Sequence, residues 1–174
     1  MKYKKILVAM DNSLQAAKVF QAALDIAQKC GSKLMLFNCI NSYFLDESAI
    51  SIGTMADVDI YGTLQQQHRQ NLQQETAKIQ AWLEAYCQQA NLRKVEAEYT
   101  YKFGEASKEI CNFAKTWNAD LIVLGRRGHK GITEILLGSV SNYILHNAPC
   151  TVLVVQEKVF PKEEKQVHAT TAAY

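Results

Sequence analysis

Short runs of apolar, often β-branched residues alternate along this chain with longer stretches whose apolar residues recur about every 3.6 positions. The short runs predict strands buried on both faces, and the longer stretches predict amphipathic helices. We expect strands at 6–10, 33–40, 95–103, 121–124 and 150–155, and helices at about 13–29, 63–90, 104–117 and 139–147. This alternation favours right-handed crossovers and parallel pairing, so the predicted fold class is α/β, a single doubly wound domain with four main helices.

Small and polar residues indicate where the elements begin and end. Ser13 or Asn12 is expected to cap the first helix, and Gly31 to end it. The segment 41–62 has no steady period and predicts a long mobile loop with no more than one helical turn. Residues 157–174 are charged and small, so we expect one domain over 1–156 followed by a polar C-terminal tail.

Composition excludes several classes of function. The 174 residues are 48% hydrophobic, enough for one full-sized core, and a formal charge of +2 is too small to indicate a nucleic-acid partner. No apolar run is long enough to span a membrane, and the N-terminus leads straight into a strand, so a cytoplasmic protein is expected. The cysteines lack metal-ligand spacing and predict reduced core residues: Cys30, Cys39, Cys87, Cys111 and Cys150.

The stretch 120–141 holds the clearest indication of a binding site. A buried strand is followed by a loop with two glycines and several basic side chains, namely Gly125, Gly128, Arg126, Arg127, His129 and Lys130. Further along, the pair Gly138-Ser139 opens the next helix, where a serine could serve as the cap. Bare amides, cations and a helix N-terminus together describe an anion site, most naturally for phosphate. The alternative is a surface turn whose arginines are only solvated.

Residues at the ends of four predicted strands should meet at one edge of the sheet. Asp11, Asn41, Gly104 and Gly125 each follow a strand. In open parallel sheets, ligands bind beyond the carboxyl ends of the strands, where the strand order reverses. Asp11 has two interpretations here, a ligand contact or a cap of the first helix.

Enzyme motifs are absent from the site. Neither GxxxxGK[ST] nor a GxGxxG after the first strand occurs. Ser139 lies outside any GxSxG elbow, and His129 has no paired carboxylate in view, so it is interpreted as an accessory phosphate contact. No carboxylates for Mg²⁺ stand in the loop, so an ion would depend on phosphate oxygens and water. No catalytic residue is assigned, so rapid turnover of a bound phosphate compound is not expected.

The spacing Gly125-x2-Gly128-x9-Gly138-Ser139 resembles the nucleotide-binding signature of the universal stress protein family. Residues 4–8 with Asp11, the turn 104–106 and the run 148–155 resemble the family's opening strand, its glycine turn and its final strand, so the resemblance covers nearly the whole chain. It implies the strand order 3-2-1-4-5, a homodimer joined through the fifth strand, and bound ATP, with ADP or AMP as alternatives and Mg²⁺ or Mn²⁺ as the ion.

The resemblance also implies the ligand contacts. Asp11 and the backbones at Ala9 and Cys39 should face the adenine and ribose. The residues implied around the ribose and phosphates are Leu124, Gly125, Arg126, Arg127, Gly128, His129, Gly138, Ser139, Val140 and Ser141. Arg126-Arg127 stand where the family commonly has a small polar residue and a histidine, which should strengthen phosphate attraction.

These features predict an ATP-binding regulatory protein. Bound nucleotide would order the loop 41–62 and so change the surface offered to an unknown protein partner. The alternatives are a slow ATP hydrolase and a structural interaction dimer with a vestigial site. A nucleotidyl transferase of the same topology is disfavoured, because neither an SGGxDS loop nor a HIGH sequence is present.

Overall fold

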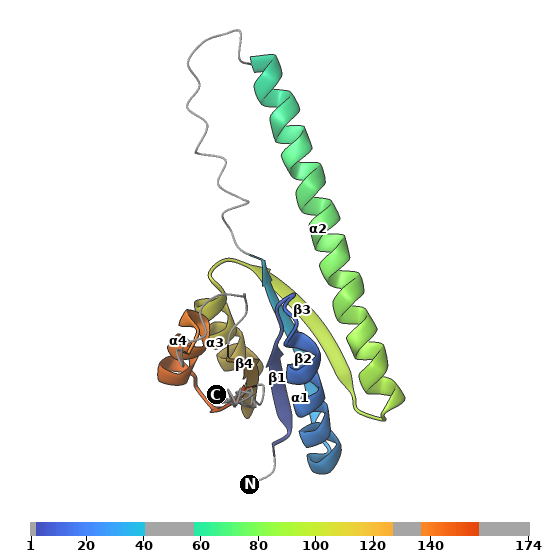
Figure 1. Ribbon diagram of the computed structural model, residues 1–174, viewed down its shortest axis with the longest axis vertical. Helices are drawn as coiled ribbons and strands as arrows, with labels where there is room; N and C mark the ends of the chain where they lie inside the picture. The colour runs from blue at the N-terminus through green and yellow to red at the C-terminus, as the bar shows by residue number, and fades with distance from the viewer. Residues whose placement is uncertain (1–2, 41–57, 127–136, 157–174) are drawn as a thin grey trace, which may run out of the picture.

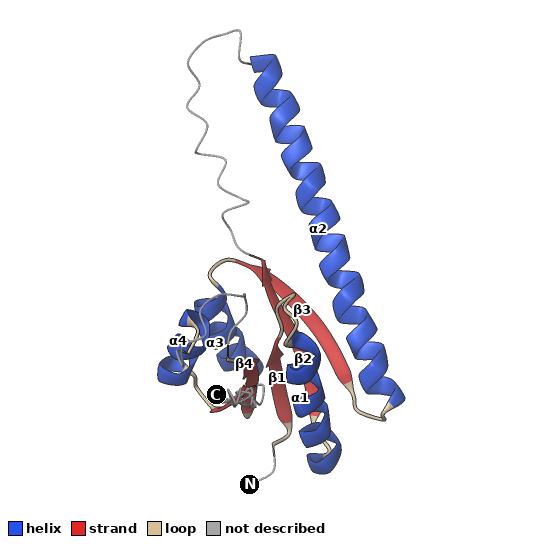
Figure 2. Ribbon diagram, in the orientation of Figure 1, coloured by secondary structure: helices blue, strands red, loops and turns tan. Residues whose placement is uncertain are grey.

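The computed structural model describes residues 3–40, 58–126 and 137–156. Within these ranges, five parallel strands form one sheet in the order β3-β2-β1-β4-β5, with four helices on its two faces (Figure 1, Figure 2). The strands are β1 (Lys5–Ala9), β2 (Lys33–Ile40), β3 (Ala97–Phe103), β4 (Leu121–Gly125) and β5 (Thr151–Val155). The helices are α1 (Ala16–Cys30), α2 (Val58–Leu92), α3 (Ala106–Trp117) and α4 (Ser139–Asn147). The predicted fold class and strand order are confirmed.

Each face of the sheet is covered by its own pair of helices. α1 and α2 lie on one side and α3 and α4 on the other (Figure 1). Ile6 and Val8 of β1 belong to the core beneath α1 and α2, whereas Leu7 belongs to the core beneath α3 and α4. Because successive side chains of a strand point to opposite faces, a strand covered on both sides must be apolar throughout. This requirement explains the uninterrupted apolar runs of the central strands.

The start of α1 differs from the prediction and its end agrees with it. Gln15 occupies the N-cap without a side-chain hydrogen bond, so the predicted cap by Ser13 or Asn12 is wrong. The Ser13 hydroxyl instead donates to the Asp11 carboxylate at 2.5 Å and accepts the Gln15 N–H at 3.3 Å, within the turn before the helix. Gly31 ends α1 as predicted, with a left-handed φ of 64° and its N–H donated to the Ala27 carbonyl.

α2 is longer than predicted. It begins at Val58, so residues 58–62 are helical and not part of a loop. Gly62 lies inside the helix, because one glycine costs only about 1 kcal/mol relative to alanine and does not end a helix of this length. The helix extends past the sheet (Figure 1), and among its described residues only Leu83, Cys87 and Ala90 are buried. The remainder of the predicted loop, 41–57, and the tail 157–174 lie outside the described residues.

The cysteine prediction is correct only in part. All five cysteines are free thiols, but only Cys87 is buried and the other four are half-buried. A cysteine that lies among apolar residues in the sequence is therefore not always buried in the core of this fold. Among the described helices, none has the length and apolar character needed to cross a membrane.

The turn between α2 and β3 contains a lysine in a backbone conformation that usually belongs to glycine. Lys94 has a φ of 60°, and its N–H donates to the Asn91 carbonyl at 2.9 Å. The next N–H, that of Val95, donates to the Ala90 carbonyl at 3.0 Å, which closes the helix end. A side chain in the left-handed region costs about 1–2 kcal/mol.

We therefore expect Lys94→Gly to raise the free energy of unfolding by up to about 1 kcal/mol, because it relieves that strain. Urea denaturation monitored by circular dichroism would measure the change. Arg93→Gly is the matched control, since Arg93 lies outside the left-handed region, and it should destabilise the protein. Equal destabilisation by both substitutions would contradict the prediction.

Candidate functional site

The direction in which successive strands are added to the sheet reverses between β1 and β4. β2 and β3 lie to one side of β1, while β4 and β5 lie to the other. Ala9 is paired with Phe37 of β2 and with Leu124 of β4, so the ends of these three strands meet at one edge. This is the position at which open parallel sheets bind ligands. The structure thus brings Ala9, Asp11, Leu124 and Gly125 to the predicted edge.

Two hydrogen bonds of residue 126 tie the start of α4 to the end of β4. The Gly138 N–H donates to the Arg126 carbonyl at 3.0 Å. The Ser141 hydroxyl lies 3.0 Å from the same carbonyl oxygen and 2.9 Å from that of Gly125, and Ser141 is only 3% exposed. The Arg126 N–H in turn donates to the carbonyl of Val155 in β5. The α4 N-terminus is therefore held directly at the carboxyl edge of the sheet.

The first turn of α4 presents uncapped amide groups. Its N-cap is Gly138, which has no side chain to accept a hydrogen bond, and Ser139 is the first helical residue. The predicted serine cap is therefore wrong. The N–H groups of Ser139, Val140 and Ser141 have no acceptor within the helix, and the helix dipole adds partial positive charge at this end. Such a helix start binds anions.

Several predicted phosphate contacts already have internal partners. The Gly138 N–H and the Ser141 hydroxyl both bond to the end of β4, so they are not free to donate to a ligand. The Arg126 N–H is likewise engaged by β5. The roles of these residues stay predictions, restricted to the atoms that remain free. Arg127, Gly128 and His129 lie outside the described residues.

The loop after β1 is shaped by Asp11. Its carboxylate accepts the Ser13 N–H at 3.3 Å and the Ser13 hydroxyl at 2.5 Å. Because Gln15 holds the N-cap, the interpretation of Asp11 as the cap of α1 is wrong. Asp11 is half-buried, and its ligand contact stays a prediction.

Cys39 occupies the β2 side of the same edge. Its thiol donates to the Gly104 carbonyl at 3.4 Å. Burial, with a smaller contribution from the charge of Glu109, raises the pKa of Cys39 to about 11, so the thiol is neutral at physiological pH. This side chain therefore offers an apolar, uncharged wall and no reactive thiolate.

Two polar residues near this edge of the sheet were not predicted as site residues from the sequence. Asn38 is 7% exposed, and its Nδ2 donates to the Met10 carbonyl at 2.8 Å, which ties β2 to the residue preceding Asp11. Its Oδ1 is buried without a partner. Glu109 of α3 lies beside Gly104, where an added Cβ would stand 3.2 Å from the Glu109 Cγ. Asn38 could have been noticed as the only amide in the apolar run 33–40.

The described residues contain no group of three or more His, Cys, Asp or Glu side chains arranged to hold a metal ion. The groups that the described residues offer to an anion at this edge are the backbone amides of the first turn of α4. Hydrogen-bond donors at a helix start, next to an apolar wall, suit an anionic ligand that also carries a flat apolar part.

Comparison with known sequences identifies relatives over most of the chain. A family model described as the universal stress protein family matches residues 2–156. The universal stress protein Sll1388 of Synechocystis sp. is 40% identical over 156 residues, which cover 90% of this chain and 99% of the relative.

Solved structures with the same fold include nucleotide complexes. The protein MJ0577 superposes with a TM-score of 0.74 at 20% identity, covering 91% of this chain and 99% of its own. A universal stress protein in complex with cAMP gives 0.62 at 20% identity, covering 91% and 100%. An Arabidopsis thaliana family protein with AMP bound gives 0.60 at 18%, covering 89% and 92%. At these identities the superpositions establish a shared fold.

Ser141→Ala should lower the free energy of unfolding by about 1–2 kcal/mol, because it removes a buried donor from the carbonyls of Gly125 and Arg126. Ser139 is exposed, so the matched change Ser139→Ala should cost about 0.5 kcal/mol or less. Thermal and urea unfolding of both variants would measure the difference. Equal stabilities would show that the Ser141 hydroxyl does not hold α4 to β4.

Proposed function

This chain belongs to the universal stress protein family, and from that premise we propose that it is a regulatory protein that binds ATP. The uncapped start of α4 at the carboxyl edge of the sheet carries the proposal. The cAMP and AMP complexes of proteins with this fold support an adenine nucleotide as the class of ligand. ADP and AMP are weaker candidates here, because they place fewer phosphate charges at the helix start.

In this proposal, backbone groups do most of the binding. The N–H groups of Ser139, Val140 and Ser141 donate to phosphate oxygens, and the Arg126 side chain adds positive charge. Asp11 and the backbones at Ala9 and Cys39 face the ribose and base. The neutral Cys39 thiol suits contact with an uncharged ring.

We further propose that the protein acts by binding and not by rapid turnover. Efficient phosphoryl transfer needs an oriented nucleophile and a positioned metal as well as cations. No residue is assigned to orient a nucleophile, so hydrolysis would be slow. A divalent ion, Mg²⁺ or Mn²⁺, would be held by phosphate oxygens and water.

The proposed assembly is a homodimer in the cytoplasm. β5 stands at one edge of the sheet, and Leu153 within it is 36% exposed. An exposed apolar edge strand is a surface that proteins normally cover. We infer that a second copy covers β5, and that the nucleotide state then controls a further protein partner.

Ser139→Pro tests the helix start directly. Proline is well tolerated at the first helical position, and the extended ψ of 153° at Gly138 suits the residue before a proline. The substitution therefore removes one amide donor while preserving α4. We expect calorimetry to show about tenfold weaker ATP binding, because one charge-assisted hydrogen bond to phosphate is lost.

Ser139→Ala is the matched control, because it removes only the exposed hydroxyl, and its affinity for ATP should stay near that of the unchanged protein. Adenosine should bind both variants equally, since it lacks phosphates. Unchanged ATP affinity in Ser139→Pro would contradict phosphate binding at α4. No binding of any adenine nucleotide to the unchanged protein would favour an interaction dimer with a vestigial site.

A further inference from the structure

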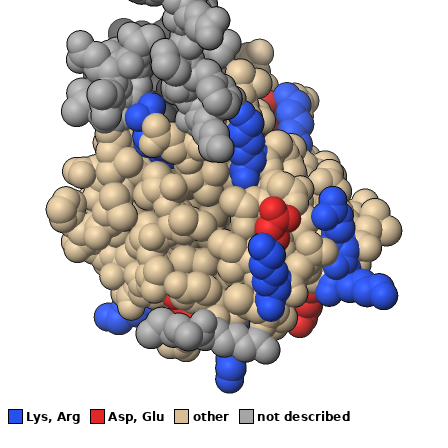
Figure 3. All heavy atoms as spheres, turned by 60° about the horizontal axis from the view of Figure 1, so that its bottom comes forward, with Lys and Arg blue, Asp and Glu red and all other residues tan. Residues whose placement is uncertain are grey.

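The end of the sheet opposite the candidate site, where the strands begin, contains a hollow. It has a volume of about 650 Å³ and lies between the ends of α1 and α2 and the starts of β1 and β2. We call it the basal hollow and define it by its charged lining residues and one amide, namely Lys4, Gln28, Lys33, Arg93, Lys94 and Glu96. Figure 3 brings this end of the molecule forward and shows many blue Lys and Arg side chains, with fewer red carboxylates between them.

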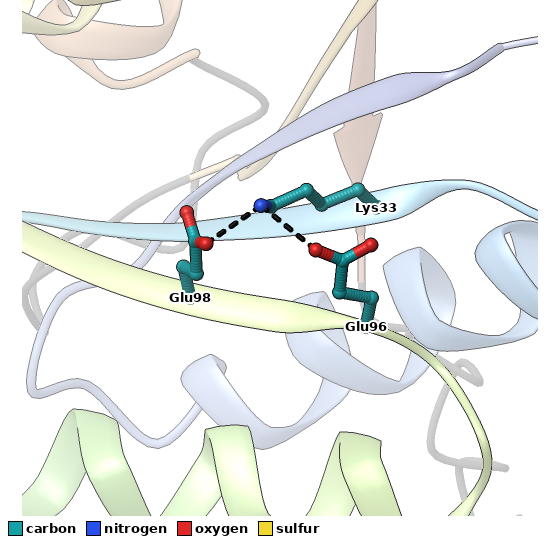
Figure 4. A network of polar contacts seen from close by, with 3 residues as sticks. All are labelled: Lys33, Glu96 and Glu98. Carbon is teal, nitrogen blue, oxygen red and sulfur yellow. Dashed lines mark hydrogen bonds and ion pairs between the residues drawn. The ribbon is translucent and has the colours of Figure 1, made fainter.

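The positive charge of the basal hollow is only partly neutralised. Lys33 is held by Glu96 at 2.9 Å and Glu98 at 2.6 Å (Figure 4). Hydrogen bonds to Glu98 and then Glu96 raise the pKa of Lys33, so this cation stays charged but already has its partners. Among the described residues, the side chains of Lys4, Arg93 and Lys94 have no carboxylate partner. Lys33 with Glu96 and Glu98 therefore carries a net charge of −1, and three exposed cations surround this group.

The backbone around these cations is fixed. The Gln28 side chain donates to the Arg93 carbonyl at 3.2 Å, which joins α1 to the turn after α2. The Lys33 N–H donates to the Lys4 carbonyl at 2.8 Å, which joins β2 to the start of β1. Lys94 keeps its side chain at a position where glycine would avoid backbone strain. The cations thus project from a rigid frame, which lowers the entropy lost on binding a partner.

The elements at the basal hollow favour an extended acidic chain over a phosphate group. α1 and α2 both end here, so their dipoles place partial negative charge at the hollow. A compact phosphate would lie against these helix ends without the helix-start amides that usually bind it. Carboxylates spaced along a peptide can instead reach the exposed cations one at a time. We propose that the basal hollow is a docking site for an acidic segment of a partner protein.

The test uses the full-length chain without nucleotide and a fluorescein-labelled peptide that alternates glutamate with serine. Fluorescence anisotropy at low salt should show binding, and the same peptide with glutamine in place of glutamate should not bind. Arg93→Gln with Lys94→Gln should weaken binding about fivefold, as expected for the loss of two exposed ion pairs. The matched control is Lys102→Gln with Lys115→Gln, which removes the same charge from exposed positions outside the hollow and should change affinity less than about twofold.

Three results would overturn the inference: no preference for the glutamate peptide, equal weakening by both double variants, or displacement of the peptide by inorganic phosphate beyond that caused by sodium chloride of the same ionic strength. Displacement by ATP beyond the same salt control would also overturn it, because β1 separates the basal hollow from the candidate nucleotide site at its other end. Lys94→Gly controls for misfolding as a cause of weaker binding. It should weaken peptide binding although the variant protein unfolds at a higher urea concentration than the unchanged protein. Peptide binding requires no nucleotide, so failure here leaves the proposed ATP site untouched.

Discussion

The carbonyl oxygen of Arg126 joins the two elements that make up the candidate site. It accepts the Gly138 N–H, lies within hydrogen-bond distance of the buried Ser141 hydroxyl, and so fixes the start of α4 at the end of β4. These bonds occupy polar groups that would otherwise be available to a ligand. The amides of the first helical turn take no part in these bonds and have no acceptor within the helix. Preorganised donors lose little entropy when an anion binds, which is why the position of this carbonyl matters for affinity.

The parallel sheet gives its two ends different electrostatic characters. At the carboxyl edge, α4 begins, and its free amides and dipole favour phosphate. At the opposite edge, α1 and α2 end, and cations of the adjoining turns surround a shallow hollow. Helix starts and helix ends are separated in this way whenever strands run parallel and helices return between them. The proposed nucleotide and the proposed protein partner would therefore contact different residues of one small domain.

The sequence alone predicts those elements whose conformation depends on burial or on neighbouring residues in the chain. Burial on both faces makes the buried residues of β1 and β4 apolar, and Gly31 ends α1 because glycine adopts a left-handed φ at little cost. The failed prediction of a serine cap for α4 concerns a choice between distant partners. A serine at a helix start is as able to bond a neighbouring strand as a ligand, and the Ser141 partners lie 15 and 16 residues away. Likewise, nothing local marks Lys94 as left-handed, because the tertiary closure of the turn imposes that conformation.

The most direct test of phosphate binding at α4 is an isotope-edited NMR titration of backbone amides with ATP and, separately, with adenosine. We expect ATP to shift the amide signals of Ser139, Val140 and Ser141, and adenosine to leave them in place. The Gly138 amide should stay protected from hydrogen exchange throughout, because its bond to the Arg126 carbonyl persists. Saturation with ATP that moves signals elsewhere and leaves the α4 amides unchanged would contradict the proposed site.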